Sequence, residues 1–145
     1  MKRNNRGFSL PELLIVVAII GIIAAIAVPS LLEAQRASRE AAAIQTLRAI
    51  VSAENTYIST KGGYQQFGDS TQLSAAGLID SAFMTSPMNK YQVSLVLGSP
   101  SSTYTATSEP TFTTLTGHFY YTSNDGVIHW HAGASAGPGD PAIPQ

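Results

Sequence analysis

The sequence predicts an α+β fold, in which a long N-terminal helix packs on a small C-terminal antiparallel β-sheet. Two observations predict the helix: residues 13–28 are all apolar or glycine, and residues 30–60 contain neither glycine nor proline. A third predicts the sheet, because the C-terminal half alternates apolar and polar side chains in short segments bounded by turn residues. We expect the helix to be transmembrane in its first half and amphipathic in its second.

Length and composition limit the classes of protein to which this chain can belong. The chain has 145 residues and a net charge of −1, which favours one domain with an appended segment. Three cations precede Phe8, so the remainder carries five basic and nine acidic side chains, and no nucleic-acid partner is predicted. Cysteine is absent, which excludes disulfides and thiolate metal sites. Charged residues are only 12% of the chain, as suits a protein that buries its surface against lipid or other copies.

A basic head, residues 1–7, precedes the apolar run, which is the order found in export signals. Phe8–Val28 comprises 21 residues, and at about 1.5 Å each these span roughly 31 Å, one hydrocarbon core. The segment therefore predicts a membrane span. An alternative is cleavage after Ala25-Ile26-Ala27, a small-x-small signal peptidase pattern, which would release a soluble protein beginning at Val28.

Residues 30–60 predict a helix with one apolar face. Ile44, Leu47, Val51 and Ile58 recur at helical spacing, and the charged side chains fall largely off that stripe. The glycine-rich stretch that follows is predicted to end the helix.

Three strands are predicted in the C-terminal half: Tyr91–Leu97, Phe112–Tyr121 and Val127–His131. Asp125-Gly126 predicts a hairpin between the last two, because glycine accepts the positive φ of a tight turn. Residues 73–79 predict a short helical turn. We expect the sheet to lie on the apolar face of the long helix.

Two further segments are predicted to lie at the surface. Residues 99–116 include eleven Ser or Thr among eighteen, which favours a strand-and-loop region with a solvated polar face over glycosylation, since the chain has no Asn-x-Ser/Thr site. The Gly- and Pro-rich tail, residues 132–145, predicts a surface arm without regular structure.

One stretch is more specific than these patterns. Residues 6–30, RGFSLPELLIVVAIIGIIAAIAVPS, combine a glycine, a phenylalanine, a nearby glutamate and the apolar run. They resemble the prepilin N-terminus of type IV pilins and of the pseudopilins of type II secretion systems. The rest of the chain is similar to that family only in plan. The resemblance implies cleavage between Gly7 and Phe8 by a prepilin peptidase, methylation of the new Phe8 amine, and extraction from the inner membrane into a helical filament.

The resemblance also implies that Glu12 meets the Phe8 amine of a neighbouring subunit. Two alternatives stay open: an intramolecular pair, because the two positions are roughly 6 Å apart along a helix, and a local role at the positive end of the helix dipole. A charge buried among helices without its partner costs about 3–5 kcal/mol, so subunit pairing would set the register of docking. Pro11 predicts that the helix begins close to it, because proline fits the first turn of a helix, where its missing amide hydrogen removes no hydrogen bond.

Gly21 and Pro29 bound an interval in which helical hydrogen bonding is weakest. In similar pilins this interval loosens on assembly, and the resemblance implies the same for residues 21–29. The alternative is structural, because Gly and Pro are common in membrane helices.

No catalytic, metal or cofactor site is predicted. His129 and His131 share one face of a strand with His118 nearby, so a three-histidine metal site is imaginable, but ordinary surface histidines explain the pattern. Some pseudopilins bind calcium in the C-terminal loop, and calcium needs about six to eight oxygen ligands. Here Asp125 and Asp140 have no acidic cluster between them, so a calcium site is not predicted.

The resemblance therefore implies a non-enzymatic subunit that polymerises into a type IV pilus-like filament, with adhesion, motility or DNA uptake as candidate outputs. The expected regions are a leader (1–7), a hydrophobic transmembrane and assembly segment (8–29) and a periplasmic or extracellular head (30–145).

The resemblance to type IV pilins also implies partners and cellular locations. The expected partners are identical subunits, prepilin peptidase, the pilus assembly machinery of the inner membrane, and membrane lipid before assembly. The expected locations are the bacterial inner membrane, as a single-pass protein, and then a cell-surface filament. Two alternatives remain: a major pseudopilin of a type II secretion system, which would form a short periplasmic piston, and a membrane-anchored or secreted binding domain.

Overall fold

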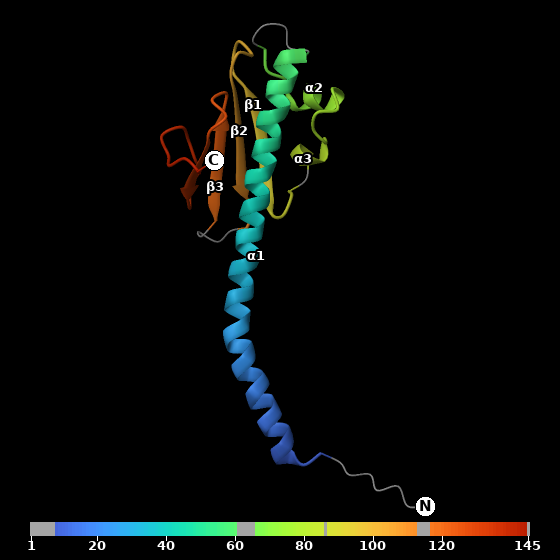
Figure 1. Ribbon diagram of the computed structural model, residues 1–145, viewed down its shortest axis with the longest axis vertical. Helices are drawn as coiled ribbons and strands as arrows, with labels where there is room; N and C mark the ends of the chain where they lie inside the picture. The colour runs from blue at the N-terminus through green and yellow to red at the C-terminus, as the bar shows by residue number, and fades with distance from the viewer. Residues whose placement is uncertain (1–7, 61–65, 86, 113–116, 145) are drawn as a thin grey trace, which may run out of the picture. The chain divides into compact units, whose positions relative to one another are not determined.

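The computed structural model describes residues 8–60, 66–85, 87–112 and 117–144. In these residues a long helix, α1 (Leu10–Thr60), is followed by two short helices and four strands (Figure 1). The chain divides into two compact units, residues 1–37 and 38–145. We call them the N-terminal unit and the C-terminal unit and describe each by itself.

Helix α1 begins where its proline allows. It starts at Leu10, so Pro11 stands in the first turn, where its missing amide hydrogen removes no intrahelical bond. From there α1 is continuous to Thr60 and passes through Pro29. The long helix predicted from the sequence is confirmed.

The strands form one antiparallel sheet, as predicted. They are β1 (Tyr91–Leu97), β2 (Tyr104–Pro110), β3 (His118–Ser123) and β4 (Ile128–Ala132), and they lie side by side in chain order. The first strand has the predicted bounds. Of the strand predicted over 112–121, Phe112 is not in a strand and residues 113–116 lie outside the described residues; β3 extends from His118 to Ser123.

Strand β2 confirms the strand expected within residues 99–116 and adds a buried face to the expected polar one. It is a central strand, paired with β1 on one side and β3 on the other. Tyr104, Ala106 and Ser108 are buried, so only the alternate face is polar and partly solvated. Sequence periodicity did not separate the two faces, because the buried face itself includes a serine.

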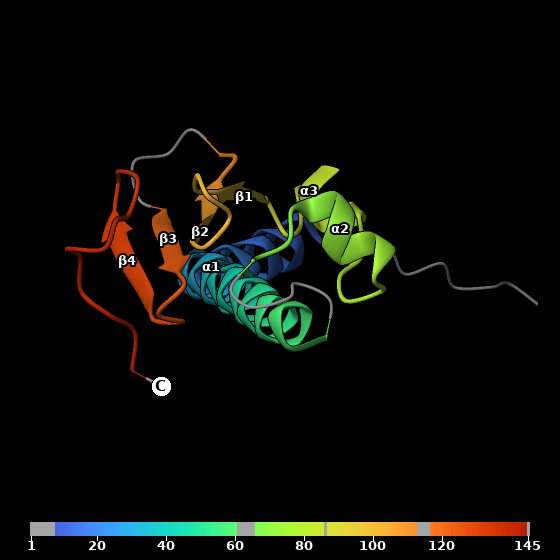
Figure 2. The same ribbon diagram turned by 90° about the horizontal axis from the view of Figure 1, so that it is seen from above.

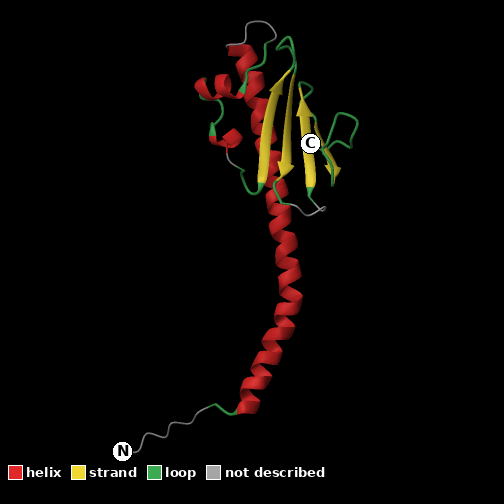
Figure 3. Cartoon of the chain, turned by 180° about the vertical axis from the view of Figure 1, so that it is seen from behind, coloured by secondary structure: helices red, strands yellow, loops and turns green. Residues whose placement is uncertain are grey.

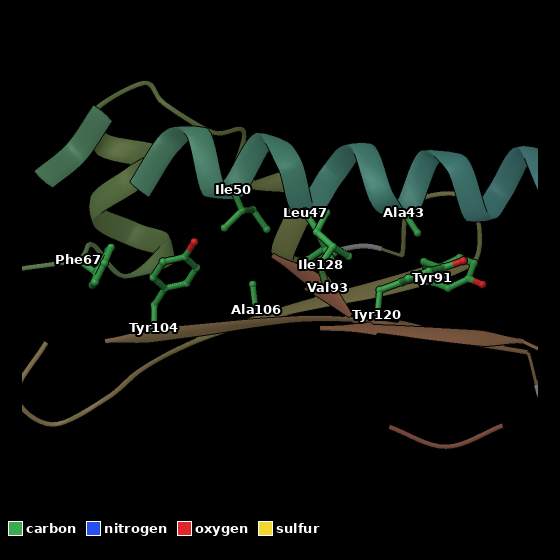
Figure 4. Close-up of a cluster of buried hydrophobic side chains, with 10 residues drawn as sticks. All are labelled: Ala43, Leu47, Ile50, Phe67, Tyr91, Val93, Tyr104, Ala106, Tyr120 and Ile128. Carbon is green, nitrogen blue, oxygen red and sulfur yellow. The ribbon is translucent and has the colours of Figure 1, made fainter. Parts of the chain in front are cut away.

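The core of the C-terminal unit lies between α1 and one face of the sheet (Figure 2). Ala43, Leu47 and Ile50 project from α1 onto Val93, Ala106 and other side chains of the sheet (Figure 4). In the view from behind, the opposite face of the strands has no described helix across it (Figure 3).

The predicted apolar stripe of α1 was slightly misplaced around the helix. Leu47 is fully buried, but Ile44, Val51 and Ile58 are only partly buried and flank the contact. The centre of the buried face includes small residues such as Ala43, because the backbone of α1 can approach the sheet closely there.

Two short helices form a second contact with α1. They are α2 (Ser70–Ala75) and α3 (Ala82–Thr85), and Leu73 and Ile79 pack with Ala53 of α1. The predicted turn at 73–79 was placed too late, because a capping box starts α2 earlier. The Gln72 amide donates to the Asp69 side chain, and the Asp69 amide donates to the Gln72 side-chain oxygen.

The tail is more regular than predicted. The Trp130 amide donates to the Pro141 carbonyl at 3.0 Å, and the Ile143 amide donates to the Ile128 carbonyl at 2.8 Å. These bonds place residues 141–143 along the outer edge of β4. The tail thereby covers a strand edge that would otherwise offer unpaired backbone groups to other chains. Composition could not predict this, because Gly and Pro specify turns but not tertiary pairing.

The predicted β3–β4 hairpin is confirmed. The Gly126 amide donates to the Ser123 carbonyl at 2.9 Å, and Gly126 has φ of +72°. Asp125 Oδ1 accepts from the Val127 amide and from the Ser123 hydroxyl, both at 3.0 Å. The positive φ at Gly126 is the feature that requires glycine.

We therefore predict that Gly126→Ala destabilises the C-terminal unit by about 1–2 kcal/mol, the usual cost of a left-handed residue with a Cβ. Gly139→Ala is the matched control, because its φ is not left-handed and no heavy atom lies within 4 Å of an added Cβ. Urea unfolding of the full chain in detergent micelles measures both variants. Equal stability of the two would contradict the role assigned to Gly126.

Candidate assembly site

The candidate site starts at the residues that precede α1. Phe8 and Ser9 are not helical, and Phe8 is 86% exposed. Gly7, the other residue of the predicted cleavage position, lies outside the described residues. An exposed, non-helical Phe8 is compatible with entry into a peptidase active site.

Glu12 is held by a residue that sequence reasoning missed. Its Oε2 accepts from the Ser9 amide at 2.8 Å and from the Ser9 hydroxyl at 2.6 Å. The amide bond is one half of a capping box. The spacing Ser9-Leu10-Pro11-Glu12 is the S-x-x-E signature of that motif, so the sequence contained the signal.

This geometry directs the carboxylate back toward the chain start. Glu12 bonds the amide of Ser9, one residue from the nitrogen that cleavage would turn into the Phe8 amine. Both bonds described for Glu12 end on Oε2, so Oε1 can accept a further donor while the cap stays intact. The intramolecular pair and the pair between subunits are both compatible with this arrangement.

The apolar segment of the N-terminal unit is exposed throughout. Its large apolar side chains range from 45% exposed at Val16 to 86% at Phe8. Among the described residues, α1 is the one helix long and apolar enough to cross a membrane. So large an apolar surface requires lipid or other protein around it.

The helix is intact across Gly21 and Pro29 in the single chain. Nothing lies within 4 Å of a Cβ added at Gly21, so glycine is not required there by packing within the chain. Near Pro29, the Ser30 hydroxyl donates to the Ile26 carbonyl at 3.3 Å. The predicted loosening of this interval concerns the assembled state and stays a prediction.

The imagined three-histidine site does not form. His118 lies on the face of the sheet toward α1, where its Nδ1 is 3.0 Å from Glu40 Oε1 and its ring lies 4.8 Å from that of Trp130. His129 and His131 pair with Tyr121 and Phe119, on the opposite face, because side chains alternate along a strand. In the part of the chain that the structure describes, no cluster of metal-ligating side chains occurs.

The carboxylates considered for calcium are both engaged locally. Asp125 Oδ1 accepts bonds within the β3–β4 turn. Asp140 Oδ2 accepts from the Gly137 amide at 2.7 Å. Each stabilises a turn of the backbone, which is an ordinary structural use of aspartate.

Comparisons with known proteins agree on the N-terminal motif. Residues 2–28 match the family described as the prokaryotic N-terminal methylation motif. The chain carries this motif in its N-terminal segment, together with the first part of α1. It is 46% identical over 66 residues to the type IV major pilin protein PilA of Myxococcus xanthus. The aligned segment covers 46% of this chain and 30% of that protein.

A second relative covers more of both chains. The chain is 34% identical over 87 residues to the type IV wide pilus major component PilA4 of Thermus thermophilus. The aligned segment covers 60% of this chain and 61% of that protein. The chain thus spans less than two thirds of the length of these relatives. No solved structure matches it significantly. Both relatives are named as major pilus components, and the α+β architecture found here is consistent with the pilin fold.

Proposed function

We propose that this chain is a structural subunit which, after cleavage between Gly7 and Phe8 and methylation of the Phe8 amine, polymerises into a type IV pilus-like filament. The observation that carries the proposal is the matched methylation motif, residues 2–28, which includes the exposed apolar first part of α1. Cleavage before Phe8 removes three cations and keeps that helix. The processed chain then has an apolar segment that either lipid or neighbouring subunits can surround.

Assembly gives Glu12 a second task. In the membrane it lies close to the end of the segment, near the headgroups, where a carboxylate costs little. Among packed helices the same charge needs a partner, because a buried charge left alone costs about 3–5 kcal/mol. The Phe8 amine of a neighbouring subunit supplies that partner. Wrongly registered subunits would bury Glu12 without it.

Two relatives support the pilus over the piston. Both are named as major pilus components, whereas a pseudopilin would build a short periplasmic structure from the same N-terminus. Adhesion, motility and DNA uptake are candidate outputs of such a pilus. Gly21 to Pro29 is the interval in which we propose that α1 loosens as the subunit leaves the membrane.

Mass spectrometry of the chain from its native membranes tests the processing. We expect an N-terminus at N-methylated Phe8. A chain that begins at Val28 would instead support the secreted binding domain, and an uncleaved Met1 would support a plain membrane anchor; either would overturn the proposal.

Substitution of Glu12 separates pairing from capping. Glu12→Gln keeps a side chain that serves in a capping box but removes the charge, so we expect normal membrane levels and at least tenfold fewer filaments. Glu33→Gln, at an exposed position of the same helix, is the matched control and should leave filament numbers unchanged. Wild-type filament numbers with Glu12→Gln would assign Glu12 to capping alone.

Deletion of the gene distinguishes the pilus from the secretion piston. We expect loss of surface filaments, seen by electron microscopy of sheared material, with protein secretion intact. Retained filaments together with lost secretion would favour the pseudopilin.

A further inference from the structure

Glu54 is the one fully buried charged side chain among the described residues. It lies on α1, two turns before the helix ends, and its exposed fraction is 0%. Neither filament pairing nor membrane insertion involves it. A charged side chain at such a position needs a specific reason, because burying an ionised carboxylate is costly.

Glu54 attaches the chain segment that follows α1. Its Oε2 accepts a hydrogen bond of 2.9 Å from the amide of Gly68. Gly68 is closely packed: a Cβ added there would lie 3.0 Å from Leu73 and 3.1 Å from Tyr57. The next residue, Asp69, caps α2. The bond to Glu54 therefore fixes the start of α2 against α1.

The bond satisfies only half of the carboxylate. Oε1 of Glu54 is buried, and no described group bonds to it. An ionised carboxylate would leave that oxygen without a donor, whereas a protonated carboxyl group carries no net charge.

The surroundings oppose ionisation. The pKa of Glu54 is raised to about 7, chiefly by burial; the Gly68 hydrogen bond opposes this rise and the negative charge of Asp69 adds to it. On the sheet side, burial and then the charges of Glu54 and Asp125 raise the pKa of Tyr104, so this phenol stays neutral at any physiological pH. The charge that acts on Glu54 from the cap of α2 is that of an acid, Asp69.

We propose that Glu54 is a protonation-controlled latch, which holds the Phe67–Asp69 segment and the start of α2 against α1 when neutral and releases them when ionised. In the neutral state, one oxygen accepts from Gly68 and the other carries the proton. In the ionised state the carboxylate recovers hydration only if the segment moves away. Phe67 then loses its edge contact with Tyr104, where the ring centroids are 4.7 Å apart.

The direction of the pH dependence follows from the raised pKa. The folded chain binds the proton up to about pH 7, while an exposed glutamate releases it near its ordinary value of 4.5. The closed latch is therefore most stable below about pH 4.5, and its advantage is lost as the pH rises toward 7. Over that interval the equilibrium shifts toward the open form by on the order of a hundredfold.

Nuclear magnetic resonance of the full chain in detergent micelles tests the latch. The Gly68 amide signal should titrate with a midpoint near pH 7. Its protection ratio, the intrinsic exchange rate at each pH divided by the observed rate, should fall at least tenfold between pH 5.5 and pH 8.5. The ratio removes the intrinsic pH dependence of exchange.

Two variants and a control sharpen the test. Glu54→Gln keeps an acceptor for Gly68 and cannot ionise, so the protection ratio should be independent of pH. Asp69→Asn keeps a good helix cap and removes the nearby charge, so the midpoint should move to lower pH. Glu33→Gln should behave as wild type.

The proposal would be overturned by a wild-type Gly68 signal that does not titrate between pH 5 and 8.5, or by an unchanged protection ratio. A Gly68 titration that persists in Glu54→Gln would also overturn it. If Glu54→Gln failed to fold, the wild-type titration and the Asp69→Asn shift would still decide. None of these outcomes depends on whether the chain forms filaments.

Discussion

The C-terminal unit depends on one contact, the packing of α1 on the sheet. Ala43, Leu47 and Ile50 are buried against the strands, and a buried leucine or isoleucine of this kind contributes roughly 1.5–3 kcal/mol. The sheet cannot replace this contact, because its other face has no described helix over it (Figure 3). The two short helices, in turn, use a neighbouring face of α1. The sheet, the two short helices and the Glu54 latch therefore all pack against or bond to the same helix, α1.

The same helix serves two environments. Its first part has no apolar side chain buried within the chain, whereas its later part is buried along one face. Apolar surface on every side suits lipid or a bundle of helices, and a single apolar face suits a sheet. Glu12 and Glu54 differ in the same way. Glu12 is exposed in the single chain and is bonded to Ser9, while Glu54 is already enclosed.

Two buried hydroxyl groups lower the stability of the core of the C-terminal unit. Ser108 and Thr122 face α1 from the middle of the sheet, and neither hydroxyl has a partner among the described residues. Unpaired buried hydroxyls typically cost about 1–3 kcal/mol each. Their small size, beside Ala106, lets the helix approach the strands. The core thus gains close packing and loses some hydrogen bonding.

The sequence by itself determined the local features: the apolar segment, the helix start beside Pro11, strand β1 and the Gly126 hairpin, since each is specified by residues close together in the chain. It also carried the prepilin motif and, in Ser9 and Glu12, an unnoticed capping box. Only the tertiary structure decided that β2 is central, that the tail pairs with β4 and that His118 turns away from His129 and His131. Burial of Glu54 was equally unpredictable, because it arises from distant segments that surround one helix turn, and no local pattern encodes which charge they will enclose.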